Sequence, residues 1–130
     1  MQINDHTAFQ VSDIEKAIEF YTKIIGLNFK FKSINEEEQE VYAFLKLDGG
    51  SLELIQKLNS DYEKPTIKPP YCPHFAIETK DMNNTMNIIN KNHVNIIKGP
   101  LEIKDEEKWI YISDPDNNII EFIEWVSKNK

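Results

Sequence analysis

The sequence predicts an α+β fold built from two similar βαβββ modules in tandem. Two observations carry this prediction: strand and helix patterns follow each other in the same order twice, and the chain matches itself after a shift of 68 positions. The length of 130 residues and the hydrophobic content of 40% suit a single domain with a packed core. We therefore expect one domain over residues 1–130, with module one at about 1–58, a linker at about 59–71 and module two at about 72–126.

The first module begins with a strand and a helix. Residues 3–11 alternate in polarity, which is typical of a strand. Ser12 and Glu15 have the spacing of a capping box, and Gly26 is well placed to end the helix. Further strands are expected at about 28–33, 41–47 and 51–57, with a charged loop or hairpin end at 35–40 and a turn at 48–50.

The second module repeats this order after a proline-containing linker. Residues 71–79 are typical of a strand, and Asp81 is expected to cap a helix that reaches about Asn92. Met82, Met86 and Ile89 form the apolar stripe of that helix. Strands are expected at about 95–98, 108–113 and 119–125.

The repeat places chemically similar residues at matching positions. A shift of 68 brings His6 onto His74 and Glu53 onto Glu121. The segment 48–55 then lies over 116–123 without a gap. Both histidines open a strand that leads into a capped helix, and both glutamates follow a turn inside an apolar strand. This shared context indicates a true duplication.

These four residues form a candidate metal site. Ala8 and Ala76 share a strand face with the two histidines and leave space beside them. A carboxylate in apolar surroundings costs several kcal/mol to bury unless a cation compensates it. The chain has no arginine, and we expect no lysine on these faces near the glutamates. Imidazole and carboxylate ligands suit Zn²⁺, Ni²⁺, Co²⁺, Mn²⁺ or Fe²⁺. The alternative is a pair of hydrogen-bonded core histidines with two solvent-facing glutamates.

Composition excludes several other classes. The net charge is −7 without a basic cluster, which argues against binding nucleic acid or an anionic membrane. Cys72 is the one cysteine, and the start of the chain lacks the pattern of an export signal, so we expect a cytoplasmic protein. His93 has no counterpart in the repeat and is interpreted as a surface residue.

With these residues in place, the chain resembles the vicinal oxygen chelate superfamily, which includes glyoxalase I, bleomycin resistance proteins and dioxygenases. Within it, the closest resemblance is to bacterial glyoxalase I, the lactoylglutathione lyases. The resemblance covers nearly the whole chain and rests on residues 6–13, 17–21, 52–54, 73–76 and 114–121. In the last segment, Asn117 stands where the family usually has glycine, a mild departure because asparagine tolerates left-handed backbone angles.

The resemblance implies a fold, a metal and a reaction. The two modules would curl a mixed sheet around a metal-centred cavity, with His6, Glu53, His74 and Glu121 as ligands of one divalent ion. The reaction would isomerise a hemithioacetal, or a similar small substrate with vicinal oxygens, through an enediolate. Glu121 would move the proton, with Glu53 as the less favoured base. The family also implies a homodimer.

The resemblance is weakest at the thiol. Glyoxalase I typically grips glutathione with arginine, including one on the first strand where this chain has Gln10. Lys30, Lys32 or Lys108 would have to take the place of the arginine, and the thiol could differ from glutathione. Phe44 lies on one aromatic strand face with Tyr42, and Trp109 lies on another with Tyr111. Gln10, Phe44, Trp109 and Tyr111 are therefore candidate substrate-binding residues, and the alternative for the aromatic residues is a place in the core.

Other functions of the same superfamily remain open. One is an epimerase that acts beside a thioester carbonyl. An extradiol dioxygenase is disfavoured because Glu53 would add a charge to its ligand set. A third is a non-enzymatic drug-binding resistance protein, a class that generally lacks the full metal set.

Overall fold

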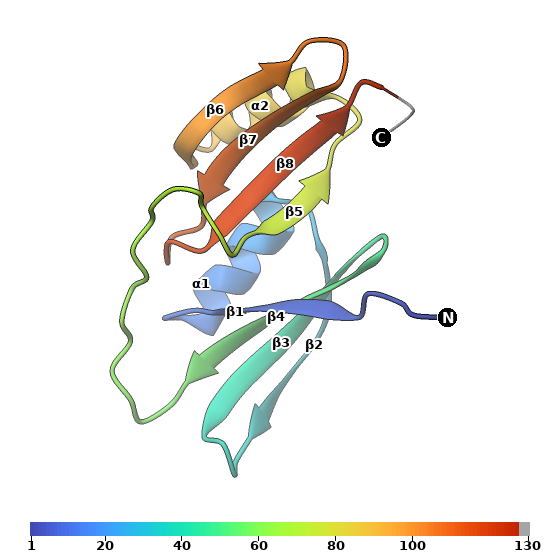
Figure 1. Ribbon diagram of the computed structural model, residues 1–130. Coiled ribbons are helices and arrows are strands. Elements are labelled where there is room, and N and C mark those ends of the chain that lie inside the picture. Colours follow the sequence, from blue (N-terminus) through green and yellow to red (C-terminus); the bar gives the residue numbers. More distant parts are fainter. Residues whose placement is uncertain (128–130) are drawn as a thin grey trace. The chain divides into compact units, whose positions relative to one another are not determined.

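The computed structural model describes residues 1–127 and confirms an α+β fold of two tandem βαβββ modules (Figure 1). The chain divides into two compact units: unit 1 spans Met1–Lys64, and unit 2 begins at Pro65. The strands form two four-stranded mixed sheets, one in each unit. No helix among the described residues is both long and apolar enough to cross a membrane.

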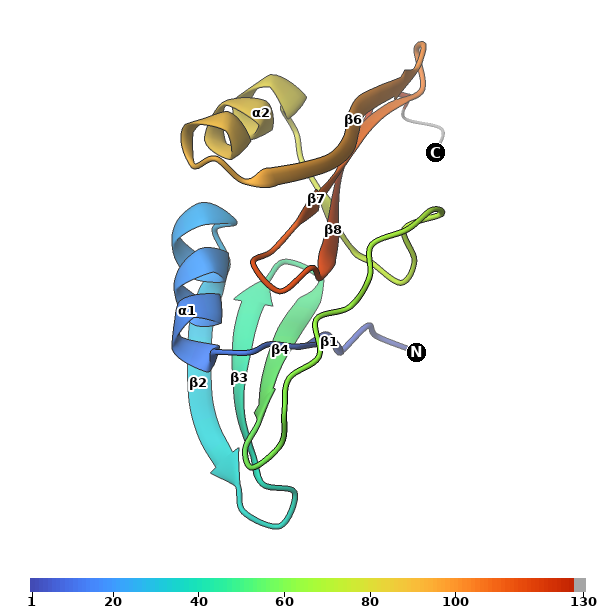
Figure 2. The same ribbon diagram turned by 90° about the vertical axis from the view of Figure 1, so that its left-hand side faces the viewer.

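Unit 1 is a four-stranded sheet with a helix on one face. The strand order is β1-β4-β3-β2, with β1 parallel to β4 and the other pairs antiparallel. Figure 2 shows α1 lying along the sheet, where it contacts β3 and β4. Its elements are β1 (His6–Gln10), α1 (Ile14–Glu19), the π-helical turn η1 (Phe20–Ile24), β2 (Asn28–Asn35), β3 (Glu40–Leu47) and β4 (Gly50–Lys57).

Unit 2 repeats this arrangement. The strand order is β5-β8-β7-β6, again with its first pair parallel, and α2 contacts β8. Its elements are β5 (Phe75–Glu78), α2 (Met82–Lys91), β6 (Asn95–Ile103), β7 (Glu107–Ser113) and β8 (Ile119–Trp125).

Each sheet has one face buried in the core of its unit, and the opposite face carries the candidate site residues. In unit 1 the buried face carries Ala43, Leu45, Leu52 and Leu54, each with no exposed surface. In unit 2 the corresponding residues are Ile110, Ile112, Ile120 and Phe122. Side chains alternate along a strand, so Glu53 and Glu121 lie on the opposite face. We call that opposite face the site face of each unit.

The repeat extends to individual hydrogen bonds. The Ile14 N–H, at the start of α1, donates to Gln56 Oε1 at 2.7 Å. The Met82 N–H, at the start of α2, donates to Glu124 Oε1 at the same distance. Each residue and its counterpart are 68 positions apart. A strand side chain thus satisfies one of the free N–H groups that every helix leaves at its first turn.

The N-terminal cap of the first helix is one correction to the prediction. Asp13, rather than Ser12, caps α1, and its carboxylate accepts from the N–H groups of Glu15 and Lys16. The predicted end of this helical segment is confirmed, because Gly26, at φ +93°, follows η1 and its cap residue. In α2 the predicted cap Asp81 is confirmed, but Thr85 takes the buried place beside Met82 and Ile89 that was expected for Met86.

Three strands differ in length from the prediction. The first, β1, covers only His6–Gln10 of the expected residues 3–11. β5 begins only at Phe75, because Tyr71 has a φ of +66° and Pro73 has no N–H for a strand ladder. β6 runs on to Ile103 and passes through Pro100, which lies where the register with β7 shifts. A proline is tolerated there because the irregularity removes the need for a ladder hydrogen bond.

Candidate functional site

The first pair of predicted ligands meets on the site face of unit 1. His6 is the first residue of β1, and Glu53 lies in the middle of the neighbouring parallel strand β4. The Cα partner of Glu53 is Ala8, whose small side chain leaves the imidazole room to reach across. His6 Nε2 lies 3.5 Å from Glu53 Oε1.

The second pair meets in the same way in unit 2. His74 was expected within a strand, but it precedes β5 by one residue. The Cα partner of Glu121 is Ala76, the counterpart of Ala8. His74 Nε2 lies 3.2 Å from Glu121 Oε1. Each unit thus brings its own histidine and glutamate together.

The other ring nitrogen of each histidine is held by a group that the sequence analysis missed. His6 Nδ1 lies 2.7 Å from Asp5 Oδ2, and His74 Nδ1 lies 2.8 Å from the Tyr71 carbonyl oxygen. A carbonyl oxygen only accepts, so His74 Nδ1 carries the hydrogen. In a neutral imidazole, Nε2 then directs a lone pair toward the carboxylate of Glu121. Only a proton or another cation between the two atoms makes this contact favourable.

A divalent metal ion fits this donor set. Two ligand atoms about 2.1 Å from one ion lie about 3.0–3.4 Å apart, depending on its geometry. The distances of 3.5 Å and 3.2 Å are close to that range. Metal-binding histidines usually donate their second N–H to a carboxylate or a backbone carbonyl, which are the two partners found here. The described residues contain no group of three or more His, Cys, Asp or Glu side chains positioned around one point. Taken by itself, each unit presents one histidine nitrogen and one glutamate oxygen as donors.

An aromatic ring flanks each pair. The ring of Phe44 meets His6 edge-on, with centroids 5.2 Å apart, and Tyr111 meets His74 in the same way at 5.5 Å. Phe44 is the cross-strand partner of Glu53, and Tyr111 is that of Glu121. These two predicted substrate-binding residues thus lie beside the ligand pairs.

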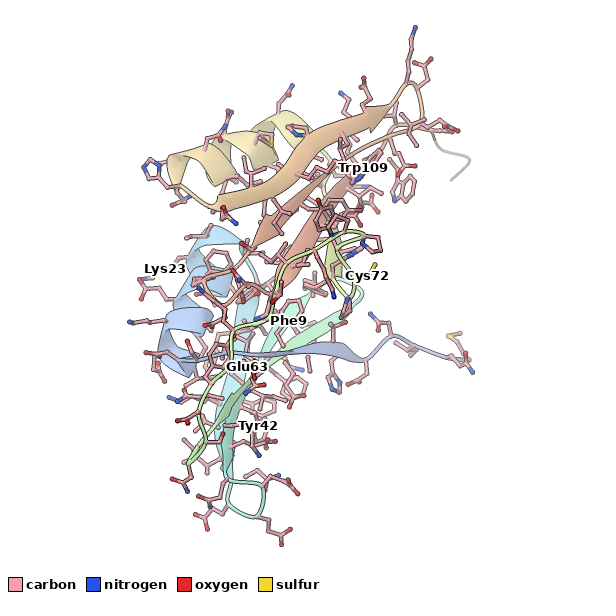
Figure 3. All side chains as sticks on the ribbon, turned by 60° about the vertical axis from the view of Figure 1, so that its left-hand side comes forward. Phe9, Lys23, Tyr42, Glu63, Cys72 and Trp109 are labelled. Carbon is pink, nitrogen blue, oxygen red and sulfur yellow. The ribbon has the colours of Figure 1, made fainter. Side chains whose placement is uncertain are left out.

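The other two predicted substrate-binding residues also lie on the site faces. Trp109 is two residues from Tyr111 on β7, which Figure 3 places in the sheet of unit 2. Gln10 lies on β1, on the same side of the strand as His6, and is exposed. Their role in substrate binding stays a prediction.

Tyr111 has an altered acidity. Burial raises the pKa of its phenol above the ordinary value near 10, and the carboxylate of Glu121 raises the pKa further. Both effects disfavour a second negative charge beside Glu121. Tyr111 therefore remains a neutral hydrogen-bond donor next to the His74–Glu121 pair over the physiological pH range.

The structure corrects the prediction of which lysines lie near the candidate site. Lys32 forms an ion pair with Glu15 of α1, away from the site face. Lys108 alternates with Trp109 and so lies on the opposite face. The expectation of no lysine near Glu53 was wrong, because Lys46 shares the site face of β3 with Phe44, in the row next to Glu53.

Three further residues from the sequence analysis are Lys30, His93 and Cys72. Lys30 falls in a β-bulge and has no cross-strand partner in the register. His93 is exposed after α2, as expected. Cys72, labelled in Figure 3 in the segment before β5, is a free and exposed thiol.

The fold and these residues define the class of protein. The chain belongs to the glyoxalase/bleomycin resistance protein/dioxygenase superfamily, whose family model matches residues 3–122. This confirms the resemblance to the vicinal oxygen chelate superfamily.

Two curated proteins and one solved structure are similar to this chain over most of its length. The chain is 31% identical to a probable lactoylglutathione lyase of Vibrio cholerae serotype O1, covering 92% of this chain and 88% of that protein. It is also 31% identical to the metallothiol transferase FosB of Staphylococcus saprophyticus, covering 93% of this chain and 76% of that protein. A solved structure of a glyoxalase I mutant from Zea mays is similar in fold, with a TM-score of 0.75, 24% identity, and coverage of 93% of this chain and 44% of that chain.

Proposed function

We propose that the protein is a metal-dependent lyase of the glyoxalase I type. His6, Glu53, His74 and Glu121 together would bind one divalent ion, one of Zn²⁺, Ni²⁺, Co²⁺, Mn²⁺ or Fe²⁺. The observation that carries the proposal is the repeated arrangement in which a histidine Nε2 faces a glutamate oxygen while its Nδ1 is held by a hydrogen bond. The identity to a probable lactoylglutathione lyase supports it.

The substrate would be the hemithioacetal of a 2-oxoaldehyde and a thiol. A divalent ion, when bound, supplies a Lewis acid that stabilises negative charge on the substrate's adjacent oxygens. Glu121 takes the proton from the carbon that bears sulfur, and an enediolate results. Glu121 then returns the proton to the neighbouring carbon, which gives a 2-hydroxy thioester. The step is an isomerisation and needs no oxidant or reductant.

The flanking residues would assist this transfer. Tyr111 is neutral and adjacent to Glu121 in the register, so its phenol can donate a hydrogen bond to a substrate oxygen. The hydrogen bond between His74 Nδ1 and the Tyr71 carbonyl fixes the orientation of the imidazole. Glu53, in the other pair, is the less favoured base.

The thiol would be held differently from glutathione in glyoxalase I. The chain has no arginine, so a thiol carboxylate would have to be held by lysine. Lys46 on the site face of unit 1 is placed for this role, whereas Lys32 and Lys108 are not. A thiol other than glutathione is consistent with this difference from glyoxalase I.

A second candidate activity is metal-dependent thiol transfer. The identity to a metallothiol transferase over 93% of the chain supports it as well as the lyase identity supports the first. The two activities share a metal and a thiol but differ in outcome. A lyase converts a preformed adduct into an isomer, whereas a transferase joins the thiol to a second molecule.

A substrate panel distinguishes these candidates. Metal-loaded protein is incubated with 2-oxoaldehydes and glutathione, cysteine or coenzyme A, and thioester formation is followed by ultraviolet absorbance and mass spectrometry. The proposal predicts a 2-hydroxy thioester with at least one thiol, and Glu121→Gln serves as the inactive control. Stoichiometric metal without thioester formation would contradict the lyase proposal, and loss of free thiol to a second substrate would favour the transferase.

Two further expectations belong to this proposal. The protein would form a homodimer, which size-exclusion chromatography with light scattering tests. It would act in the cytoplasm, which cell fractionation tests. A drug-binding protein without catalysis would instead contain no stoichiometric metal.

A further inference from the structure

Three aromatic rings form a continuous cluster on the site face of unit 1. Phe31 stacks on Phe44, with centroids 5.3 Å apart and planes 18° from parallel. Tyr42 meets both rings edge-on, at 6.0 Å and 6.2 Å. We call Phe31, Tyr42 and Phe44 the aromatic platform.

The platform adjoins the first ligand pair. Phe44 is the cross-strand partner of Glu53, and its ring meets the His6 imidazole. Phe31 in turn pairs with Phe44 across β2 and β3. A substrate held at His6 and Glu53 would therefore have the platform beside it.

The ring of Phe31 is not part of the core of unit 1. Phe31 remains 44% exposed, and it lies on the face opposite the buried Ala43 and Leu45. An exposed aromatic ring that neighbouring rings already hold in place can bind an apolar group, because it offers a large apolar area at little cost in conformational entropy.

The other module provides an internal comparison. The cross-strand partner of Tyr111 in unit 2 is Lys98, so Lys98 occupies the place that Phe31 has beside Phe44. The same βαβββ frame is thus built with a lysine at this position. Phe31 is accordingly not a requirement of the fold.

We propose that the aromatic platform binds an aromatic group on the aldehyde-derived part of the substrate. The preferred substrates would be hemithioacetals of aryl 2-oxoaldehydes rather than of small aliphatic ones. This inference rests on the proposed lyase function and specifies its substrate class. Phe31 is the specificity-determining residue, because it presents the most exposed ring of the three.

Phe29 supplies a matched control on the same strand. It is also a phenylalanine, it is 50% exposed, and it pairs with buried Leu45 rather than with Phe44. The bulge between Phe29 and Phe31 places the two rings on opposite faces of the sheet. Removing either ring deletes the same exposed apolar group, but only Phe31 belongs to the platform.

The test compares phenylglyoxal with methylglyoxal at a fixed thiol, as a ratio of kcat/KM values. The wild type should favour phenylglyoxal, and Phe31→Ala should lower this preference about 3- to 10-fold, the value of one aromatic pair. Phe31→Lys, which copies Lys98, should lower it at least as much, whereas Phe29→Ala should leave it unchanged. Equal ratios in the wild type and Phe31→Ala, or an equal fall in both alanine variants, would overturn the proposal.

A binding measurement separates this proposal from the lyase function. Calorimetry with mandelate and with lactate compares an aromatic and an aliphatic 2-hydroxy acid without turnover. If the protein turns over neither aldehyde, the lyase function fails, but tighter mandelate binding that Phe31→Ala abolishes would still support the platform. Equal affinity for the two acids in the wild type would overturn it. Circular dichroism melts confirm that each variant is folded.

Discussion

The two units carry the same His–Glu pair on the same βαβββ frame, but different groups hold the imidazole in each. In unit 1 the His6 and Glu53 side chains are 37% and 17% exposed, and the imidazole is held by Asp5, a side chain that is itself 88% exposed. In unit 2 the exposed fractions of His74 and Glu121 are 21% and 14%, and the imidazole is held by a backbone carbonyl. The His74–Glu121 pair is thus the more enclosed of the two, and a main-chain carbonyl holds its imidazole. The His6–Glu53 pair is the more open, and an exposed side chain holds its imidazole.

This difference suggests a division of labour. The more enclosed pair in unit 2 has its imidazole orientation set by the fold and a neutral Tyr111 beside it, which suits proton transfer at Glu121. The more open pair in unit 1 adjoins the aromatic platform and Lys46, which suits substrate recognition.

The largest difference is expected between the two glutamates. Glu121→Gln should lower kcat by about 10²–10⁴-fold, the usual contribution of a general base. Glu53→Gln should weaken metal binding but reduce kcat less when metal is saturating. Steady-state kinetics over a metal titration measures both. A kcat loss in Glu53→Gln that equals or exceeds the loss in Glu121→Gln would exchange the roles of the two units.

A smaller difference is expected between the groups that hold the histidines. Asp5→Ala should weaken metal affinity about tenfold, the low end of the range for a partner of a metal ligand, because Asp5 is exposed. Tyr71→Phe should leave the affinity nearly unchanged, because the bond to His74 comes from its backbone carbonyl. Competition with a chromophoric chelator measures both affinities. Equal affinities in Asp5→Ala and wild type would show that His6 does not need Asp5.

The helix caps should differ in the free energy of unfolding. Asp13 accepts from two N–H groups of α1, whereas Asp81 accepts from one of α2. Asp13→Ala should cost about 1–2 kcal/mol and Asp81→Ala about 0.5–1 kcal/mol. Urea denaturation measures both, and a larger loss for Asp81→Ala would show that the hydrogen bonds of the cap do not control its strength.

The smallest effect is expected at Tyr111. Its pKa is raised by burial first and by Glu121 second, so Glu121→Gln in metal-free protein should lower the pKa partway toward 10. Because the folded pKa lies above the unfolded value, stability falls as pH rises above about 10, where the unfolded chain releases this proton first. Difference absorbance of the phenolate, with Tyr111→Phe as the blank, measures the shift. An unchanged pKa in Glu121→Gln would separate Tyr111 from the ligand pair.

Sequence reasoning predicted the two histidines and two glutamates that the structure brings together in pairs. Equal spacing and alternation survive duplication, so His6, Glu53, His74 and Glu121 could be singled out, and their role as metal ligands stays a prediction. The order of strands and helices was found for the same reason. These features depend on local periodicity, which a sequence displays directly.

The missing parts depend on local backbone geometry. Phe29 and Phe31 would share a face in a regular strand, and only the bulge between them sends Phe31 to the site face. Tyr71 acts through its carbonyl, so its residue type carries no signal. Asp5 lies outside β1, where alternation no longer predicts direction. Lys46 was missed because the row next to Glu53 is defined by cross-strand register, which sequence alone does not specify.

In the proposed metal site, one ion requires both His–Glu pairs. Elemental analysis of purified wild-type protein is compared with His6→Ala/Glu53→Gln and with His74→Ala/Glu121→Gln, each confirmed as folded. We expect one divalent ion per chain in the wild type and clear loss of the ion in both double variants. A double variant that keeps a full ion per chain, or a wild type with no metal after growth in metal-supplemented medium, would contradict it.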